Sequence, residues 1–330
     1  MPYINGSHHV TLSVGGAQED VDFHVRTLGL RFIKKTVLFD GGLPIYHLYY
    51  SNANGDPSAV ITTFPWKQAG LVGRPGTNQA RECNLSVPVG SLDYWTRRLA
   101  SFDVETSSVE VLGTRRLLFK HPTGIDYALI EVADDPRVGY TGGGVPGEYA
   151  IHGIYGIGIH VYNPENMVEF LNDSFSGQGL VEEGDRVAVR VGEPEHGNVV
   201  ELVLNRADEP GTWRYGAGTF HHFAWNLDAL DNQAELKAEL EGIGYTDVSE
   251  LKDRTYFKSM YMRTPGGALF ELAVTAEGGW TCDESPEELG QNFMLPPHWA
   301  SHRAEIMEKL EPVTVPTSPT DATAPTDLEA

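Results

Sequence analysis

The sequence contains two similar segments, HHVTLSV at residues 8–14 and HHFAWNL at residues 221–227, and they decide the fold. Each begins with a His-His pair and continues as an alternation of apolar residues with others, which predicts a half-buried strand. The pairs lie 213 positions apart (221 − 8). A third strand-like segment, TPGGALFELAV, places Glu271 49 positions after His222 (271 − 222). Two histidines and one carboxylate, each projecting from a strand, are the ligand set typical of non-haem Fe(II).

The surroundings of the first segment form a unit that is repeated. After the strand at 8–14, residues 15–30 have helical spacing, and three further strand-like stretches follow up to residue 64. A single unit of this kind leaves one face of its sheet uncovered, so units must pair. We therefore predict an α+β fold of four βαβββ modules that form two pseudo-twofold half-barrels. The other three units lie at residues 80–132, 154–205 and 219–275.

The chain is predicted to divide into two halves and a tail. Residues 1–135 hold the first two modules, and residues 152–311 hold the last two together with an amphipathic helix at 298–310. Residues 136–151 are rich in Gly and Pro and form the predicted linker. Residues 312–330 are a Pro/Thr/Ala segment with few apolar residues, for which we expect disorder.

Composition excludes several classes of partner. The net charge of −22 makes nucleic acid an improbable ligand, because phosphate contacts need clustered Lys and Arg. No apolar run reaches the roughly 18 residues of a membrane span, and the N-terminus has no signal-peptide pattern. The two cysteines, Cys83 and Cys282, do not suggest a disulfide framework. We expect a cytoplasmic protein without a nucleic-acid or membrane partner.

Alignment of the four modules selects three candidate metal ligands. His9 of the first module aligns with His222 of the fourth, and Glu271 of the fourth aligns with Glu201 of the third. Only the fourth module has both a His and a Glu, and only the first adds a second His. We therefore expect these two modules to face each other and to hold Fe(II), Mn(II), Zn(II) or Ni(II). The alternative is that these histidines are packed core residues, and Glu201 is either a relic or a structural carboxylate.

With these residues in view, the chain resembles the vicinal oxygen chelate (glyoxalase) superfamily, and within it the hydroquinone-cleaving ring dioxygenases. The resemblance covers residues 6–310, and its specific motifs are HHVTLSVGGAQEDVDF, TFHHFAW and YMRTPGGALFE. It implies that His9, His222 and Glu271 are the metal ligands. The implied metal is Fe(II), with Mn(II) as the alternative.

The resemblance also implies five catalytic residues around the metal, namely His8, Thr11, His221, Arg254 and Tyr261. His8 or His221 would act as a base, and Tyr261 would hydrogen-bond the bound oxygen with Arg254 holding it in place. Strand alternation directs His8 and His221 away from the metal face, so this placement requires a local bulge. Without the resemblance, Tyr261 and Arg254 would be interpreted as ordinary strand surface.

The implied reaction is the opening of a para-hydroquinone ring with O₂ to a muconic semialdehyde-type product. The partners are then a small aromatic substrate and O₂, and we expect a homo-oligomer. One alternative is a catechol extradiol dioxygenase. Another is a glyoxalase-like lyase or isomerase, which would need a fourth ligand where the first module offers only Thr62 or Thr63. A metal-free binding module would lack the three ligands.

Overall fold

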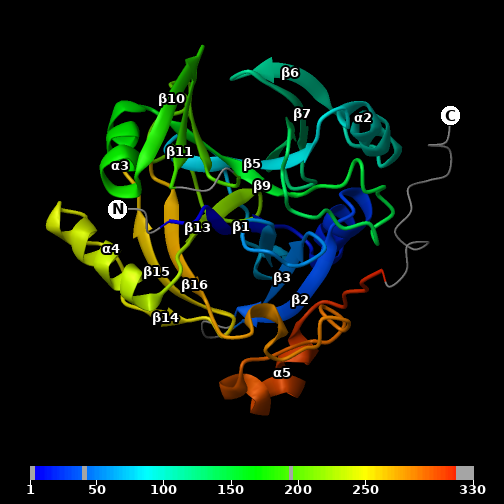
Figure 1. Cartoon of the computed structure of the whole chain (residues 1–330). Helices are drawn as coiled ribbons and strands as arrows, with labels where there is room; N and C mark the ends of the chain where they lie inside the picture. The colour runs from blue at the N-terminus through cyan, green and yellow to red at the C-terminus, as the bar shows by residue number, and fades with distance from the viewer. Residues whose placement is uncertain (1–3, 39–42, 193–195, 317–330) are drawn as a thin grey trace.

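The computed structural model describes residues 4–38, 43–192 and 196–316, and its described part consists of four βαβββ modules in two curled sheets (Figure 1). The module helices lie on the outside of the sheets. The predicted α+β architecture of paired half-barrels is confirmed. The first module comprises β1 (Ser7–Val14), α1 (Ala17–Val21), η1 (Asp22–Thr27), β2 (Arg31–Leu38), β3 (Ile45–Ser51) and β4 (Val60–Pro65).

The other three modules repeat this order of elements. The second comprises β5 (Gln79–Pro88), α2 (Leu92–Ser101), β6 (Ser107–Val111), β7 (Thr114–Lys120) and β8 (Asp126–Val132). The third comprises β9 (Gly153–Val161), α3 (Glu165–Phe175), β10 (Gly177–Glu183), β11 (Arg186–Val191) and β12 (Val199–Leu204). The fourth comprises β13 (Thr219–Asn226), α4 (Leu230–Gly242), β14 (Lys252–Asp253), β15 (Phe257–Arg263) and β16 (Leu269–Thr275).

Modules one and four share a sheet, as the alignment of histidines predicted. Its strand order is β14-β15-β16-β13-β1-β4-β3-β2, and the antiparallel pair β1–β13 lies at its centre with Thr11 opposite His222. Modules two and three form the second sheet, β10-β11-β12-β9-β5-β8-β7-β6. Each sheet therefore takes strands from both halves of the chain. The division at residues 135 and 152 stays a prediction.

The two faces of β1 explain how its sequence positions the site. Val10, Leu12 and Val14 are fully buried in the main hydrophobic cluster, which also contains side chains of β5 and β9 from the other sheet. By alternation His9 and Thr11 point to the opposite, concave face. Because both faces are covered, all eight residues of β1 are buried. A polar side chain on the concave face is consequently held in a dry, rigid environment.

The C-terminal segment closes against the first module. The predicted helix at 298–310 is a 3₁₀ segment, η4 (Pro297–His302), followed by α5 (Arg303–Lys309). Ile306 of α5 packs on Val37 of β2, below the sheet in Figure 1. Pro297 stands at the first position of η4, where the backbone N–H that it lacks has no partner within the helix.

The described residues include the first part of the predicted tail, 312–316, which contacts the first module. Val313 and Val315 pack against the main cluster, and the Thr314 amide donates to Gln18 Oε1 at 2.8 Å. These apolar side chains are sufficient to hold residues 312–316 on the first module. The rest of the predicted tail, 317–330, lies outside the described residues.

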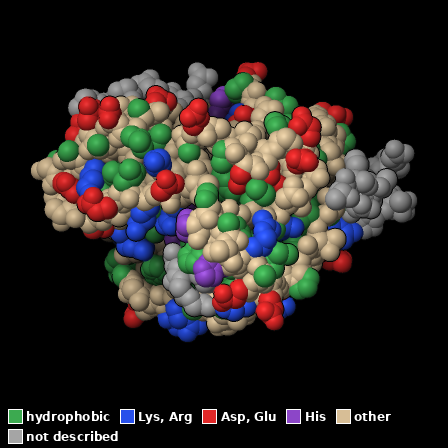
Figure 2. Space-filling view, turned by 90° about the horizontal axis from the view of Figure 1, so that it is seen from below, with side chains coloured by type: hydrophobic (Ala, Val, Ile, Leu, Met, Phe, Trp, Pro, Cys, Tyr) green, Lys and Arg blue, Asp and Glu red, His purple; other side chains and the backbone are tan. Residues whose placement is uncertain are grey.

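The charged surface is consistent with the acidic composition. On the face shown in Figure 2, Asp and Glu side chains are spread among basic and polar ones. Among the helices of the described residues, none is long and apolar enough to cross a membrane.

Candidate metal centre and substrate cavity

Three buried side chains from three adjacent strands converge on the concave face of the first sheet. His9 (β1) and His222 (β13) approach each other with 2.9 Å between their Nε2 atoms. Glu271 (β16) places Oε2 2.8 Å from His222 Nε2 and 3.7 Å from His9 Nε2. The structure thus brings together the three residues that the repeat alignment selected.

The chemistry of this group fits a divalent metal ion. Burial, followed by the charge of Arg254, lowers the pKa of His222 to about 3, so its imidazole is neutral near pH 7. Burial likewise lowers the pKa of His9 well below its usual value. Glu271 Oε1 accepts a hydrogen bond from Ser259, whereas the buried Oε2 has no hydrogen-bond partner. Neutral imidazoles and an unsatisfied carboxylate oxygen that converge on one point are what such an ion requires.

His8 and His221 each lie against the metal ligand that follows them, at places where the pairing of β1 with β13 shifts its register. The pairing of β1 with β13 is irregular between Ser7 and His9, and the His8 and His9 Nδ1 atoms lie 2.8 Å apart. The Nδ1 atoms of His221 and His222 lie 2.7 Å apart. An irregularity of the predicted kind is therefore present in β1, and both residues can orient the ring of a ligand.

The environments of His8 and His221 differ. His221 lines the cavity described below. His8 is fully buried against Phe257 and Trp280, and its Nε2 lies 3.0 Å from Thr275 Oγ1. Burial lowers the pKa of His8 to about 4 and that of His221 to about 3. The catalytic roles implied for both residues stay predictions.

A cavity of about 490 Å³ adjoins the three ligands, which is a size suited to a small aromatic molecule. The C-terminal segment contributes Pro296, His298 and Trp299 to its wall. The lining side chains include His47, Tyr49, Phe64, His221, Arg254, Tyr256, Phe257, Tyr261 and Trp299.

Tyr261 and Arg254 form a hydrogen-bonded pair in this wall. Tyr261 lies opposite Glu271 in the β15–β16 ladder. Arg254 Nε donates to the Tyr261 hydroxyl at 3.2 Å, and its guanidinium lies 5.5 Å from the ring centre. Burial, and then the charge of Glu271, raises the pKa of Tyr261 above its usual value. The phenol therefore keeps its proton and can donate it in a hydrogen bond to a molecule in the cavity.

Sequence reasoning missed His47, Tyr49 and Ser259. His47 and Tyr49 lie two residues apart in the strand IYHLYY, so alternation would have placed both on one face. The repeat offered a signal for Tyr49, because Tyr49 pairs with Thr62 in the first module as Tyr261 pairs with Glu271 in the fourth. Ser259 gave no signal, because a serine in a strand is common.

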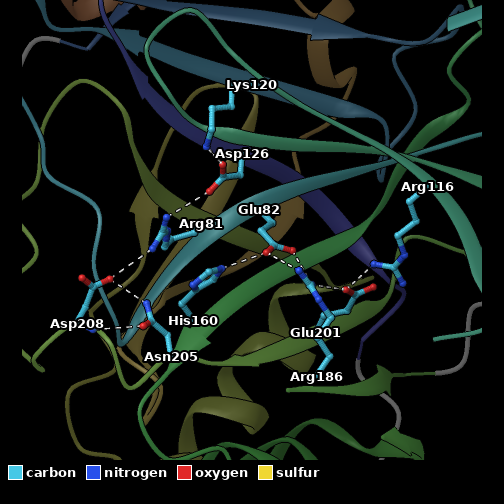
Figure 3. Close-up of polar contacts among 10 residues, drawn as sticks. All are labelled: Arg81, Glu82, Arg116, Lys120, Asp126, His160, Arg186, Glu201, Asn205 and Asp208. Carbon is cyan, nitrogen blue, oxygen red and sulfur yellow. Dashed lines mark hydrogen bonds and ion pairs between the residues drawn. The ribbon is translucent and has the colours of Figure 1, made fainter. Parts of the chain in front are cut away.

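In the second sheet, an ion-pair network occupies the positions that correspond to the metal centre (Figure 3). Glu82 takes the place of His9, and Glu201 that of Glu271. Arg186 Nη1 joins them, 2.8 Å from Glu82 Oε2 and 3.1 Å from Glu201 Oε2. Arg116 donates to Glu201 at 2.7 Å. A guanidinium thus supplies the positive charge here, so Glu201 is a structural carboxylate, one of the two alternatives.

A second buried cluster, Asp20 with His24 and His121, also has ligand atoms close enough together for a metal ion. The Thr123 amide donates to His121 Nδ1, so the proton of this neutral ring lies on Nε2, which faces Asp20 Oδ1 at 3.3 Å. Asp20 also accepts from Tyr50 at 2.6 Å. Burial alone would raise the pKa of Asp20, but His24 and His121 more than offset this and lower it. Oδ2 of Asp20 is thus satisfied by the Tyr50 and Thr63 hydroxyls, whereas Oδ1 has no hydrogen-bond partner and faces the two imidazoles.

Comparisons with known proteins agree with this geometry. Residues 154–272 match the model of the Glyoxalase/Bleomycin resistance protein/Dioxygenase superfamily. The chain is 37% identical over 316 residues to a chlorohydroquinone/hydroquinone 1,2-dioxygenase of Sphingobium indicum, covering 94% of this chain and 98% of the relative. It is 34% identical to the "Putative ring-cleaving dioxygenase MhqO" of Bacillus subtilis, over 94% of this chain and 97% of that protein.

Solved structures give the same assignment. A crystal structure of a "putative dioxygenase" from Bacillus subtilis superposes with a TM-score of 0.88 at 34% identity, covering 96% of this chain and 99% of the other. Glyoxalase I from Zea mays has a TM-score of 0.58 at 13% identity over 82% of this chain and 92% of its own, which shows the fold alone. The chain belongs to the glyoxalase superfamily. Within that superfamily, it is a member of the ring-cleaving dioxygenase family.

Proposed function

We propose that the protein is an Fe(II)-dependent dioxygenase that opens the ring of a para-hydroquinone with O₂ to a muconic semialdehyde-type product. The observation that carries this proposal is the three-ligand group beside a cavity of aromatic size. Three ligands on one side of an ion leave positions for two reactants. The hydroquinone substrate is taken from the name of the Sphingobium relative, with which identity extends over nearly the whole chain.

The metal and its ligands have a defined part in this proposal. His9, His222 and Glu271 would hold the ion, and Mn(II) is the alternative to Fe(II). When bound, the ion would bring a ring oxygen and O₂ together and allow electrons to pass from the ring to O₂. His8 and His221 orient the two imidazole ligands through their Nδ1 contacts.

Other residues of the cavity bind and orient the reactants. Tyr261 donates its hydroxyl proton in a hydrogen bond to an oxygen of the reactants, and Arg254 fixes the direction of that hydroxyl. Phe257 and Tyr256 offer ring faces against which an aromatic substrate packs. Trp299 contributes the C-terminal wall, which limits the access of water.

The lyase alternative requires a fourth protein ligand from the first module. Within the described residues, the metal-ligand group contains three members. Thr62 is directed into a hydrogen bond with Thr11, and Thr63 donates to Asp20 in a different part of the module. The open ligand set therefore favours a reaction that needs two free positions.

The test is O₂ consumption by protein loaded anaerobically with Fe(II), with hydroquinone and catechol assayed side by side. We expect uptake with hydroquinone, and loss of both bound iron and uptake in His222→Ala. The matched control is His302→Ala, an exposed histidine outside the cavity lining. Uptake with catechol alone would replace the hydroquinone assignment. Absence of uptake with either compound, in protein that holds one metal per chain, would refute the dioxygenase proposal.

A further inference from the structure

A continuous chain of hydrogen-bonding groups leads from the metal centre to the cavity wall. Thr11 Oγ1 lies 2.8 Å from His222 Nε2 and 2.6 Å from Thr62 Oγ1. Thr62 Oγ1 lies 3.0 Å from His47 Nε2, and His47 Nδ1 lies 2.9 Å from the Tyr49 hydroxyl. Every link is short enough for a proton to pass along a hydrogen bond.

The sheet itself aligns these groups. Thr11 pairs with Thr62 in the parallel ladder β1–β4, and Thr62 pairs with Tyr49 in the antiparallel ladder β3–β4. The side chains of paired residues lie on the same face, so the row of hydrogen-bonding groups crosses three neighbouring strands. Thr11, Thr62 and Tyr49 are buried, and His47 is half-buried; His47 and Tyr49 contribute to the wall of the cavity. The hydrogen-bonded groups thus connect the metal end of the cavity, through two buried hydroxyls, to side chains in another part of its wall.

The number of protons on these four side chains restricts the directions in which their hydrogen bonds can point. Each hydroxyl donates one hydrogen bond, and the two nitrogens of neutral His47 act as one donor and one acceptor. All members must therefore donate toward the metal centre or all away from it. Once His222 Nε2 holds a metal, it is no longer a partner for Thr11. A ring hydroxyl bound beside His222 is the group that would take its place.

We propose that Thr11, Thr62, His47 and Tyr49 form a proton relay that removes the hydroxyl proton of the bound aromatic substrate. This inference rests on the proposed function. The substrate O–H bond breaks as an O–H bond to Thr11 forms, while the Thr11 proton passes to Thr62 and the Thr62 proton to His47 Nε2. The proton on His47 Nδ1 moves to the Tyr49 oxygen, and the phenolic proton of Tyr49 passes to water in the cavity. Each relay member ends with as many protons as it began with.

The electrostatics suit a group that passes protons without storing them. Burial, and then the charges of His222, Arg254 and His221, lower the pKa of His47 well below its usual value. Burial, and then the charge of Glu271, raises the pKa of Tyr49 well above its usual value. His47 is thus a neutral ring and Tyr49 a protonated phenol before substrate binds, as the relay requires.

The relay is tested by proton release on anaerobic mixing of metal-loaded protein with hydroquinone, followed with a pH indicator. Because O₂ is absent, the readout is independent of ring opening. We expect one proton per bound hydroquinone in the wild type. His47→Leu should slow release by about 100-fold, the usual contribution of a positioned proton-transfer group. Its metal content should stay unchanged, and added imidazole should restore the rate. His302→Leu is the matched control.

A second, more conservative variant tests the relay in case His47→Leu does not fold. Tyr49→Phe keeps the ring and removes only the last hydroxyl, and it should also slow release. Wild-type rates in both variants, or slow release in His47→Leu that imidazole does not restore, would overturn the relay. Binding of hydroquinone to the wild type without proton release would overturn it as well. Absence of O₂ consumption by the wild type would instead refute the proposed function, so the two failures are distinguishable.

Discussion

Replacement of Glu271 by Gln should change stability in opposite directions without and with metal. The carboxylate of Glu271 is fully buried, and its Oε2 lies 2.8 Å from His222 Nε2 without a hydrogen-bond partner from the protein. A glutamine keeps an acceptor for Ser259 and offers an N–H to the lone pair of His222. An unsatisfied buried polar group costs about 1–3 kcal/mol, and more when it is charged. We therefore expect the metal-free variant to be more stable by about 1–3 kcal/mol.

With metal the order reverses. Metal at about 100 times its dissociation constant stabilises the folded wild type by about 2.7 kcal/mol. At about 2.1 cal/mol/K of unfolding entropy per residue, each kcal/mol raises the melting temperature of a 330-residue chain by about 1.4 °C. The wild type should thus gain about 4 °C from the metal. Glu271→Gln loses the anionic ligand, so its melting temperature should respond little.

Thermal unfolding under anaerobic conditions, with and without Fe(II), measures both effects. The matched control is Glu201→Gln, since that carboxylate is held by Arg116 and Arg186. This control should lose stability in both conditions and keep its response to metal. An equal metal-induced shift in Glu271→Gln and the wild type would refute our reasoning. A metal-free Glu271→Gln protein less stable than the wild type by several kcal/mol would also refute it.

Three further predictions concern the cavity, the second sheet and the tail. Tyr261→Phe should keep its iron and lower kcat by about 10- to 100-fold, and an unchanged kcat in steady-state assays would make Tyr261 purely structural. The pKa of Glu82 is lowered from 4.5 to about 2, because hydrogen bonds from His160 and Arg186 outweigh burial. Its stabilisation of about 3 kcal/mol is therefore present above pH 4.5 and lost as the pH falls toward 2. Denaturant titrations should show a smaller loss over that range in Glu82→Gln, and a loss equal to that of the wild type would contradict this. Deletion of 317–330 should leave stability unchanged, whereas deletion of 313–330 should cost about 1–2 kcal/mol through Val313 and Val315 in the same titrations. Equal stability of the two truncated proteins would show that these contacts contribute nothing.

The ligand group could be predicted from the sequence because repeats and strand alternation determine it. His9 and His222 occupy equivalent positions in two modules, and the period of two along a strand places Glu271 on the matching face. The paired sheet followed because a single module cannot cover its own sheet. These features depend on local pattern, which a single sequence contains.

The remaining features depend on contacts between segments far apart in the sequence. The Arg186 bridge between Glu82 and Glu201 forms only when β11, β12, β9 and β5 are assembled in one sheet. The His47–Thr62 link needs the register of the β3–β4 ladder. The register shift before His9 depends on how β1 pairs with β13, which alternation alone does not specify. Such features can be identified only when the fold is known.

The most direct test of the central claim is the fate of the two atoms of O₂. Fe(II)-loaded protein would be mixed with hydroquinone under ¹⁸O₂, and the product analysed by mass spectrometry. We predict a ring-opened product that carries label from O₂, formed with one O₂ consumed per hydroquinone. Formation of unlabelled benzoquinone, or of no product, would contradict the assignment of this metal centre to ring cleavage.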